Sequence, residues 1–246
     1  MRIKNFLKRS HAIRGLVTDY RLLRRLWVNP KTKKAVGEYL NSVEVAKLQL
    51  GGGGGASENW LITDLVPQTS SIVYLNVAGP FPIPDQSFDY IACEHLIEHL
   101  DWFDGQNMLR ECFRVLKPEG RIRIATPDLE MILGLYTKKD TRDKIDYMNY
   151  LNKRFPLLCP EPKPAFAVNC MVRSWGHQFI YDRRTLEVAM AEAGFVNCRM
   201  QKVGESEDPN LRGLEQRDND PNSKRQNAFE TFVLEANRPQ SHVNQA

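Results

Sequence analysis

The sequence lacks the features of a membrane-spanning, secreted or disulfide-bonded protein. No apolar run approaches the ~18 residues that a membrane-spanning helix needs, and no N-terminal segment has the uninterrupted apolar core of a secretory signal. The five cysteines are odd in number and widely spaced, and none forms a C-x-x-C pair. We therefore expect no disulfides, no cysteine zinc site, and a reducing, cytoplasmic location.

Acidic residues are scarce in residues 1–40, where 11 Lys/Arg face two Asp/Glu, although the net charge of the whole chain is only +4. Apolar residues recur every three or four positions through residues 3–27, which predicts a basic amphipathic helix that Pro30 ends. Residues 1–40 are therefore expected to form an extension. Three roles stay open for it: packing on the domain, contact with an anionic membrane at its inner face, or a targeting peptide or nucleic-acid arm.

From residue 45 onward, short apolar strands alternate with amphipathic helices. Strands are predicted at 45–50, 60–63, 72–75, 88–93, 121–125, 198–203 and 229–236, and helices at 101–117 and 182–193. This order predicts a doubly wound, mostly parallel, seven-stranded α/β sheet over residues 45–236 with both faces covered. An insertion at 128–181, a polar loop at 205–227 and a disordered tail at 237–246 complete the expected organisation.

One strand does not suit this expectation. Arg121 and Arg123 alternate along residues 121–125, although a strand buried on both faces is normally apolar throughout.

A run of five glycines at 51–55 follows the first strand, and Asp64 ends the second. In open α/β sheets, ligands bind at the carboxyl ends of the strands. Glycines let a ligand approach the backbone closely, and an acid can accept hydrogen bonds from a ribose diol. The run alone could be a flexible linker, but the flanking strands favour a ligand loop. Asp64 comes too early for the acid ~20 residues on that a nicotinamide dinucleotide site requires.

Further motifs follow in a fixed order. The chain reads LGGG at 50–53, FPIPDQSFD at 81–89, EHLIEH at 94–99, LKPEG at 116–120, TPDL at 126–129, GH at 176–177 and AGF at 193–195. With Trp60 and Asp64 in register, the series resembles class I methyltransferases that use S-adenosylmethionine (SAM), in particular those associated with polysaccharide biosynthesis. The resemblance covers residues 45–236. It departs from the family at Gly52, Asn59 and Asn76, where cysteine, glycine and aspartate are usual.

The resemblance implies a Rossmann-like fold, SAM as the cofactor and a small-molecule or glycan acceptor. Gly51 and Gly53 would face the methionine part of SAM. Asp64 would hold the ribose hydroxyls, and Asn76 would lie near the adenine. The family context points to O-methylation of a sugar or glycan intermediate.

Glu94 and His95 would line the sulfonium and the acceptor pocket, again by resemblance. A hydroxyl acceptor benefits from a general base, and histidine has a suitable pKa. His177 is the first candidate because it lies in the predicted insertion; His95 and His99 follow, and a structural hydrogen bond is the alternative for each. Residues 95–99 also spell H-x-x-E-H, a zinc-protease signature that requires both histidines on one helix. The predicted strand runs to Cys93, so this segment is expected to be a strand-to-helix junction, and no metal is expected.

The sequence therefore predicts a SAM-dependent methyltransferase. The alternative is a SAM-binding or regulatory protein of the same fold that has no catalytic activity. A nucleic-acid partner is not expected, because the domain is mildly acidic and has no stripe of interleaved aromatic and basic residues. The sequence makes no prediction of oligomeric state.

Overall fold

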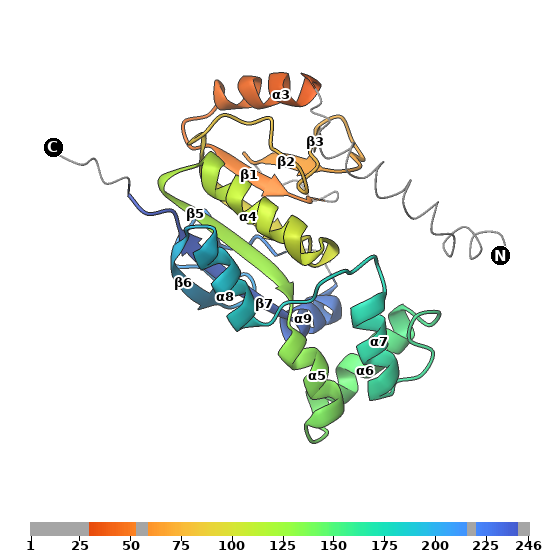
Figure 1. Cartoon of the computed structure of the whole chain (residues 1–246). Coiled ribbons are helices and arrows are strands. Elements are labelled where there is room, and N and C mark those ends of the chain that lie inside the picture. The colour runs from red at the N-terminus through yellow and green to blue at the C-terminus, as the bar shows by residue number, and fades with distance from the viewer. Residues whose placement is uncertain (1–29, 53–58, 216–219, 241–246) are drawn as a thin grey trace, which may run out of the picture.

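The computed structural model describes residues 30–52, 59–215 and 220–240 (Figure 1). In this part of the chain, seven strands form one sheet in the order β3-β2-β1-β4-β5-β7-β6. The strands are β1 (Lys47–Leu50), β2 (Leu61–Asp64), β3 (Val73–Tyr74), β4 (Phe88–Glu94), β5 (Leu116–Pro127), β6 (Val196–Gln201) and β7 (Thr231–Asn237). Strand β7 is antiparallel to both of its neighbours, and the other pairs are parallel. The predicted seven-stranded, mostly parallel α/β fold is confirmed.

The predicted helix at residues 3–27 lies outside the described residues, as do most of the glycine run and the end of the C-terminal tail.

The register of the parallel strands places their carboxyl ends along one edge of the sheet. Leu50 of β1 pairs with Thr63 of β2 on one side and with Cys93 of β4 on the other. Cys93 in turn pairs with Ile124 of β5. The residues that follow these positions therefore lie side by side, where ligands bind in open α/β sheets.

One face of the sheet packs against helices. The aligned Leu50, Cys93 and Ile124 belong to the main hydrophobic cluster together with residues of α4 (Trp102–Val115) and α8 (Arg183–Glu192). Both helices begin as predicted: the Asp101 carboxylate accepts a hydrogen bond from the backbone of the first turn of α4, and Asp182 does the same for α8. These caps satisfy backbone N–H groups that a helix leaves without partners.

A helix precedes the first strand of the sheet. Residues 30–40, which were expected to belong to the basic extension, form α3 (Pro30–Leu40), with Pro30 at its first position. Val36 is 1% exposed within the main cluster, and the Thr32 hydroxyl donates to the Tyr74 carbonyl oxygen at 2.7 Å. Helix α3 is therefore part of the α/β domain.

The other face of the sheet carries a polar row, which explains the alternating arginines. Gln49, Ala92, Arg123 and Glu235 are aligned across β1, β4, β5 and β7. The segment 202–215, rather than a helix, covers Arg123, because the guanidinium donates to the carbonyl oxygens of residues 202 and 205. The expectation that both faces are apolar is wrong at this position, since a loop with polar groups supplies the partners.

Arg123 is 1% exposed and lies between two buried carboxylates. Its Nε and Nη2 contact the two oxygens of Glu215 at 2.6 and 2.8 Å, and its Nη1 contacts Glu235 at 2.5 Å. These carboxylates raise the pKa of Arg123 against the opposing effect of burial. The cluster anchors the segment 202–215 to the sheet.

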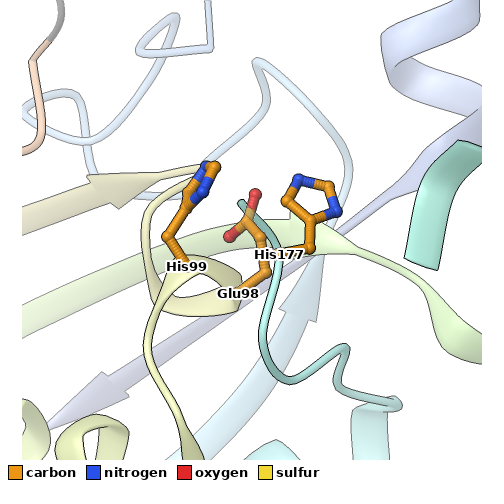
Figure 2. A group of neighbouring side chains, drawn as sticks. All are labelled: Glu98, His99 and His177. Atoms are coloured by element: carbon orange, nitrogen blue, oxygen red, sulfur yellow. The ribbon is translucent and has the colours of Figure 1, made fainter. Parts of the chain in front are cut away.

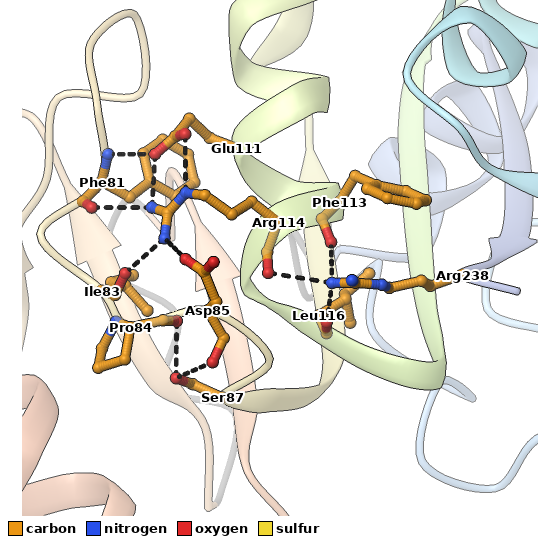
Figure 3. Close-up of polar contacts among 10 residues, drawn as sticks. All are labelled: Phe81, Ile83, Pro84, Asp85, Ser87, Glu111, Phe113, Arg114, Leu116 and Arg238. Carbon is orange, nitrogen blue, oxygen red and sulfur yellow. Dashed lines mark hydrogen bonds and ion pairs between the residues drawn. The ribbon is translucent and has the colours of Figure 1, made fainter. Parts of the chain in front are cut away.

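A second arginine organises the proline-rich turn before β4 (Figure 3). From α4, Arg114 donates to the carbonyl oxygens of Phe81 and Ile83 at 3.0 and 2.8 Å and pairs with Asp85 at 2.6 Å. Glu111, one turn earlier, pairs with Arg114 and accepts from the Phe81 N–H. The turn is therefore held against α4 by the Arg114–Asp85 ion pair and by the backbone hydrogen bonds of Arg114 and Glu111, whose own bidentate pair lies within the helix.

Arg238, just after β7, caps the far end of α4 (Figure 3). Its Nη1 donates to the carbonyl oxygens of Phe113, Arg114 and Leu116 at 2.7, 3.0 and 2.6 Å. A cation at this end of a helix satisfies free carbonyls and complements the helix dipole.

The predicted insertion contains three helices: α5 (Leu129–Thr137), α6 (Arg142–Arg154) and α7 (Pro164–Arg173). They have their own buried cluster, which includes Ile132, Leu151 and Met171. Figure 1 shows them together beyond the carboxyl end of β5. No helix of the described residues is long and apolar enough to cross a membrane.

The expected loop at 205–227 is partly helical. Helix α9 (Pro221–Glu230) begins at an Asp220 cap, whose carboxylate accepts from the Ser223 N–H at 2.8 Å. The aspartate and the proline at the first helical position are the signals of a helix start. The low apolar content of the helix hid it from periodicity.

Candidate functional site

The glycine turn after β1 has no room for side chains. Gly51 has a φ of +67°, and a Cβ there would lie 3.0–3.1 Å from the side chain of Leu96. A Cβ on Gly52 would lie 2.2 Å from Cγ2 of Ile62. This contact accounts for glycine at a position where the resembling family has cysteine. Gly53, also predicted to contact the cofactor, lies outside the described residues.

The predicted ribose and adenine contacts lie along the same edge of the sheet. Asp64 ends β2, and its Oδ1 accepts from the Val66 N–H at 2.8 Å. Asn76 follows β3 and accepts from the Ala78 N–H at 3.2 Å. Glu94, the last residue of β4, is half-buried. The structure therefore brings these three side chains to the edge where the glycine turn lies.

A cavity of about 540 Å³ opens beside this edge. It is bounded by the ends of β4 and β5, the insertion, the segment 202–215 and α9. Its lining includes the aromatic side chains Tyr150, Phe155 and Trp175, the histidines His95, His99 and His177, and the polar residues Arg154, Glu215, Ser223, Lys224, Asn227 and Glu230. Leu96, which packs on Gly51, directly follows His95. The chain therefore passes from the contact of Leu96 with Gly51 to the cavity wall within one residue, while the cavity lining includes none of Gly51, Asp64 and Glu94.

His95 is held by hydrogen bonds on both sides of its ring. It is 7% exposed and has a φ of +46°, a conformation that non-glycine residues rarely adopt. Its Nε2 lies 3.0 Å from Asn227 Oδ1 and 2.9 Å from Thr231 Oγ1, and its Nδ1 lies 3.2 Å from Glu98 Oε1. These contacts suit a residue that positions its neighbours more than one that takes a proton from an acceptor.

His177 has one ring nitrogen tied to the backbone. Its Nδ1 lies 2.6 Å from the Met171 carbonyl oxygen. A carbonyl only accepts, so Nδ1 carries the hydrogen and Nε2 has the lone pair. Burial lowers the pKa of His177, although the Met171 carbonyl and Glu98 act in the opposite direction. The His99 ring lies 4.9 Å away, edge to face.

Glu98 lies between the two histidines (Figure 2). Its side chain is fully buried, and one ligand-type atom from each of Glu98, His99 and His177 lies within 4.8 Å of the others. The Thr126 hydroxyl donates to Glu98 Oε2 at 3.1 Å. Burial alone would raise the pKa of Glu98, but the contact with His95 and nearby imidazoles hold it below the usual range.

The sequence predicted the three histidines but not their partners. The structure brings His95, His99 and His177 to one cavity, as the prediction requires. Glu98 was visible within the H-x-x-E-H spacing but was given no role. The cavity residues that belong to α6 and α9 lie far from the motifs in the sequence. For α9, the helix-start residue Asp220 was the available sequence signal.

The fold and this site share features with one class of protein. A seven-stranded sheet with one antiparallel strand, a tight glycine turn after β1 and an acid ending β2 are the features of class I methyltransferases. The residues present fit SAM, because Gly51 and Gly52 carry no side chain of their own at the turn and Asp64 ends the neighbouring strand. Residues 48–124 match the family model described as a methyltransferase domain. The match and the fold support a SAM-dependent methyltransferase that uses SAM as its cofactor.

Solved structures similar to this chain include three methyltransferases. A Thermotoga maritima SAM-dependent methyltransferase is 16% identical, with a TM-score of 0.46 and coverage of 93% of this chain and 99% of its own. An Archaeoglobus fulgidus SAM-dependent methyltransferase is 14% identical, with a TM-score of 0.45 and coverages of 89% and 99%. Haemonchus contortus phosphoethanolamine N-methyltransferase 2 is 12% identical, with a TM-score of 0.43 and coverage of 86% of this chain and 53% of its own.

No curated protein sequence matches this chain significantly. At these identities and TM-scores, the similar structures say nothing about the methyl acceptor.

Proposed function

We propose that this methyltransferase transfers the methyl group of SAM to a hydroxyl group of a sugar or glycan-type acceptor. One observation carries the proposal: a cavity of about 540 Å³ is lined by aromatic and histidine side chains, and His95 of this lining directly precedes Leu96, which contacts Gly51. This volume falls within the ~300–1,000 Å³ of typical small-molecule sites.

The cofactor would lie along the carboxyl ends of β1, β2 and β4. Gly51 and Gly53 would approach the methionine part, Asp64 the ribose and Asn76 the adenine. Glu94 would face the sulfonium, where a carboxylate complements the positive sulfur. These roles follow from the resemblance and from the alignment of strand ends in the register.

The cavity suits an acceptor with both apolar and hydroxyl-rich surfaces. Phe155 and Trp175 meet edge to face at 5.0 Å, and they would pack on the C–H faces of a sugar ring. Ser223 and Asn227 of α9 offer hydroxyl and amide groups on the same lining. Together these groups would bind and orient an acceptor of this class.

His177 is the proposed proton acceptor. When bound, SAM would supply a methyl group activated by its positive sulfur, with S-adenosylhomocysteine as the leaving group. The hydroxyl proton passes to Nε2 of His177, because Nδ1 already donates to Met171. His99 is the second candidate. His95 positions Glu98 and α9 through its own contacts.

The first experiment is calorimetry with S-adenosylhomocysteine (SAH). We expect micromolar binding that Asp64→Ala weakens at least about tenfold, or ~1.4 kcal/mol. Folded wild-type protein that does not bind SAH would contradict the cofactor site.

Turnover is then measured with methyl-labelled SAM and a panel of monosaccharides, nucleotide sugars and glycans. His177→Ala is expected to lower kcat by about 10²–10⁴-fold with unchanged SAH affinity. His11→Ala is the matched control and should keep full activity. SAH binding without any methylated product would favour the alternative, a SAM-binding or regulatory protein without catalytic activity.

We also propose that residues 3–27 contact anionic membranes, on the basis of their charge and spacing. A variant lacking residues 1–29, which keeps the packed helix α3, should lose co-sedimentation with phosphatidylglycerol vesicles. Unchanged sedimentation would exclude this role.

A further inference from the structure

Two hydrogen-bonded segments of the chain carry Glu98, His99 and His177. Glu98 and His99 lie in a short 3-10 turn, η1 (Ile97–His99), at the end of β4. The N–H groups of Gln178 and Phe179 donate to the Glu98 carbonyl oxygen at 2.8 and 3.2 Å. The Gln178 side chain also donates to the His99 carbonyl oxygen. The three side chains therefore converge because their backbones are joined, as Figure 2 shows.

Two of the three donors that are needed for a metal ion, His177 and Glu98, already have outer support. His177 Nδ1 donates to Met171, which orients Nε2 outward. Glu98 Oε2 accepts from Thr126, and Glu98 Oε1 faces His95. Ligating histidines usually donate their second N–H to a carbonyl or carboxylate, and ligating carboxylates are themselves hydrogen-bonded.

The ligand atoms are close enough to share one ion. They lie within 4.8 Å of one another, and atoms bound about 2.1 Å from one ion lie within ~4.2 Å of each other. A small rotation of the half-buried His99 or His177 ring closes this difference. Both rings line the cavity, so the remaining coordination positions would face the acceptor.

We propose that Glu98, His99 and His177 form a site for a divalent transition-metal ion, open to the acceptor cavity. Two imidazoles and one carboxylate suit zinc, iron, cobalt or nickel, whereas magnesium and calcium prefer sets of oxygen ligands. The buried carboxylate offsets part of the cation's charge. No metal was expected here from the sequence, because the H-x-x-E-H segment was not predicted to be a helix. The third ligand, His177, lies 78 residues after His99.

The role of this site rests on the proposed function. A bound cation would take the His177 lone pair that the metal-free protein uses for a proton. The acceptor hydroxyl would then bind the cation, which lowers the pKa of the hydroxyl, and its proton would leave to water. The cation would also fix the acceptor oxygen on the SAM side of the cavity.

The test uses the full chain after treatment with a chelator. Cobalt(II) titration, followed by visible absorption, and zinc calorimetry measure binding without any acceptor. We expect wild-type protein to bind one ion, with His99→Ala, His177→Ala and Glu98→Gln each weakened about 100-fold or more. A His11→Ala/His242→Ala double variant, which removes the two histidines outside the described residues, should bind like wild type.

X-ray absorption of the wild-type zinc complex tests the ligands without a variant, and we expect two imidazoles and oxygen. Folded wild-type protein that binds neither ion, or binding that none of the three substitutions weakens, would overturn the site. SAH calorimetry on the same samples separates the two proposals. SAH binding without metal binding removes only the metal site, whereas loss of both also removes the proposed function.

Discussion

Replacing Arg123 by methionine is expected to cost about 4 kcal/mol of unfolding free energy. The substitution keeps the length of the side chain and removes the only charge between Glu215 and Glu235. The side chains of Arg123, Glu215 and Glu235 are 1%, 2% and 9% exposed, so water does not replace the guanidinium. Removing one member of a buried ion pair typically costs about 3–5 kcal/mol, because the remaining charge stays buried.

The contacts of Arg123 explain why a cost within this range is expected. The guanidinium makes three hydrogen bonds to carboxylate oxygens and two to backbone carbonyls of the segment 202–215. A domain has about 5–15 kcal/mol of stability in total, so a loss of this size is readily measured. With a urea slope of about 2 kcal/mol/M, the unfolding midpoint should fall by about 2 M.

Urea unfolding followed by circular dichroism provides the assay, with two control variants. Arg121→Met changes the neighbouring arginine on the same strand face. Its side chain is 39% exposed and its pair with Asp208 is 3.3 Å long, so we expect a loss below about 1 kcal/mol. A triple variant, Arg123→Met with Glu215→Gln and Glu235→Gln, removes all three charges and should recover at least half of the loss.

Hydrogen exchange gives a second readout, because Arg123→Met should speed exchange selectively in residues 202–215. An Arg123→Met protein within 1 kcal/mol of wild type, or no less stable than Arg121→Met, would refute the reasoning.

Three further substitutions test the packing that surrounds the site. Gly52→Ala should weaken SAH binding at least about tenfold in calorimetry, because the new Cβ would lie 2.2 Å from Cγ2 of Ile62. Adding Ile62→Leu, which removes that atom, should restore part of the SAH affinity. Arg238→Gln should cost about 2 kcal/mol and lower Tm by about 4–8 °C, since the carbonyls of Phe113, Arg114 and Leu116 at the end of α4 lose a charged donor. Tyr181→Phe should raise stability by about 1 kcal/mol in urea unfolding, because the buried hydroxyl has no hydrogen-bond partner within the described residues; a loss of stability would contradict it.

The sequence predicted the elements whose signals are local. Asp101 and Asp182 cap their helices as expected, because a cap needs only a side chain and the backbone of the next turn. The strands at the glycine turn were found for the same reason, since short apolar runs between turn residues are typical of buried parallel strands. The edge of the sheet that holds Gly51, Asp64 and Glu94 followed from these elements and the parallel topology.

The sequence did not predict features that depend on distant partners. Arg123 was unexplained because Glu215 and Glu235 lie 92 and 112 residues away, Glu215 in an expected loop and Glu235 on another predicted strand. Helix α9 is polar on all sides, so only Asp220 and Pro221 marked its start. Helix α3 was assigned to the basic extension because residues 1–40 are rich in Lys and Arg. The structure buries its apolar residue Val36 in the main cluster.

The H-x-x-E-H segment shows why spacing alone misleads at the site. On a helix, residues 95 and 99 would share a face and could bind one zinc ion, with Glu98 beside them as the general base. Here the left-handed backbone at His95 turns that ring toward α9, away from a shared site, while His177 arrives beside His99. A fully buried carboxylate costs several kcal/mol unless a positive group compensates it. His95 contacts Glu98 on one side. On the cavity side, either a proton on an imidazole or a metal ion bound by His99 and His177 can supply the positive charge. Which of the two is present decides the chemistry of the site.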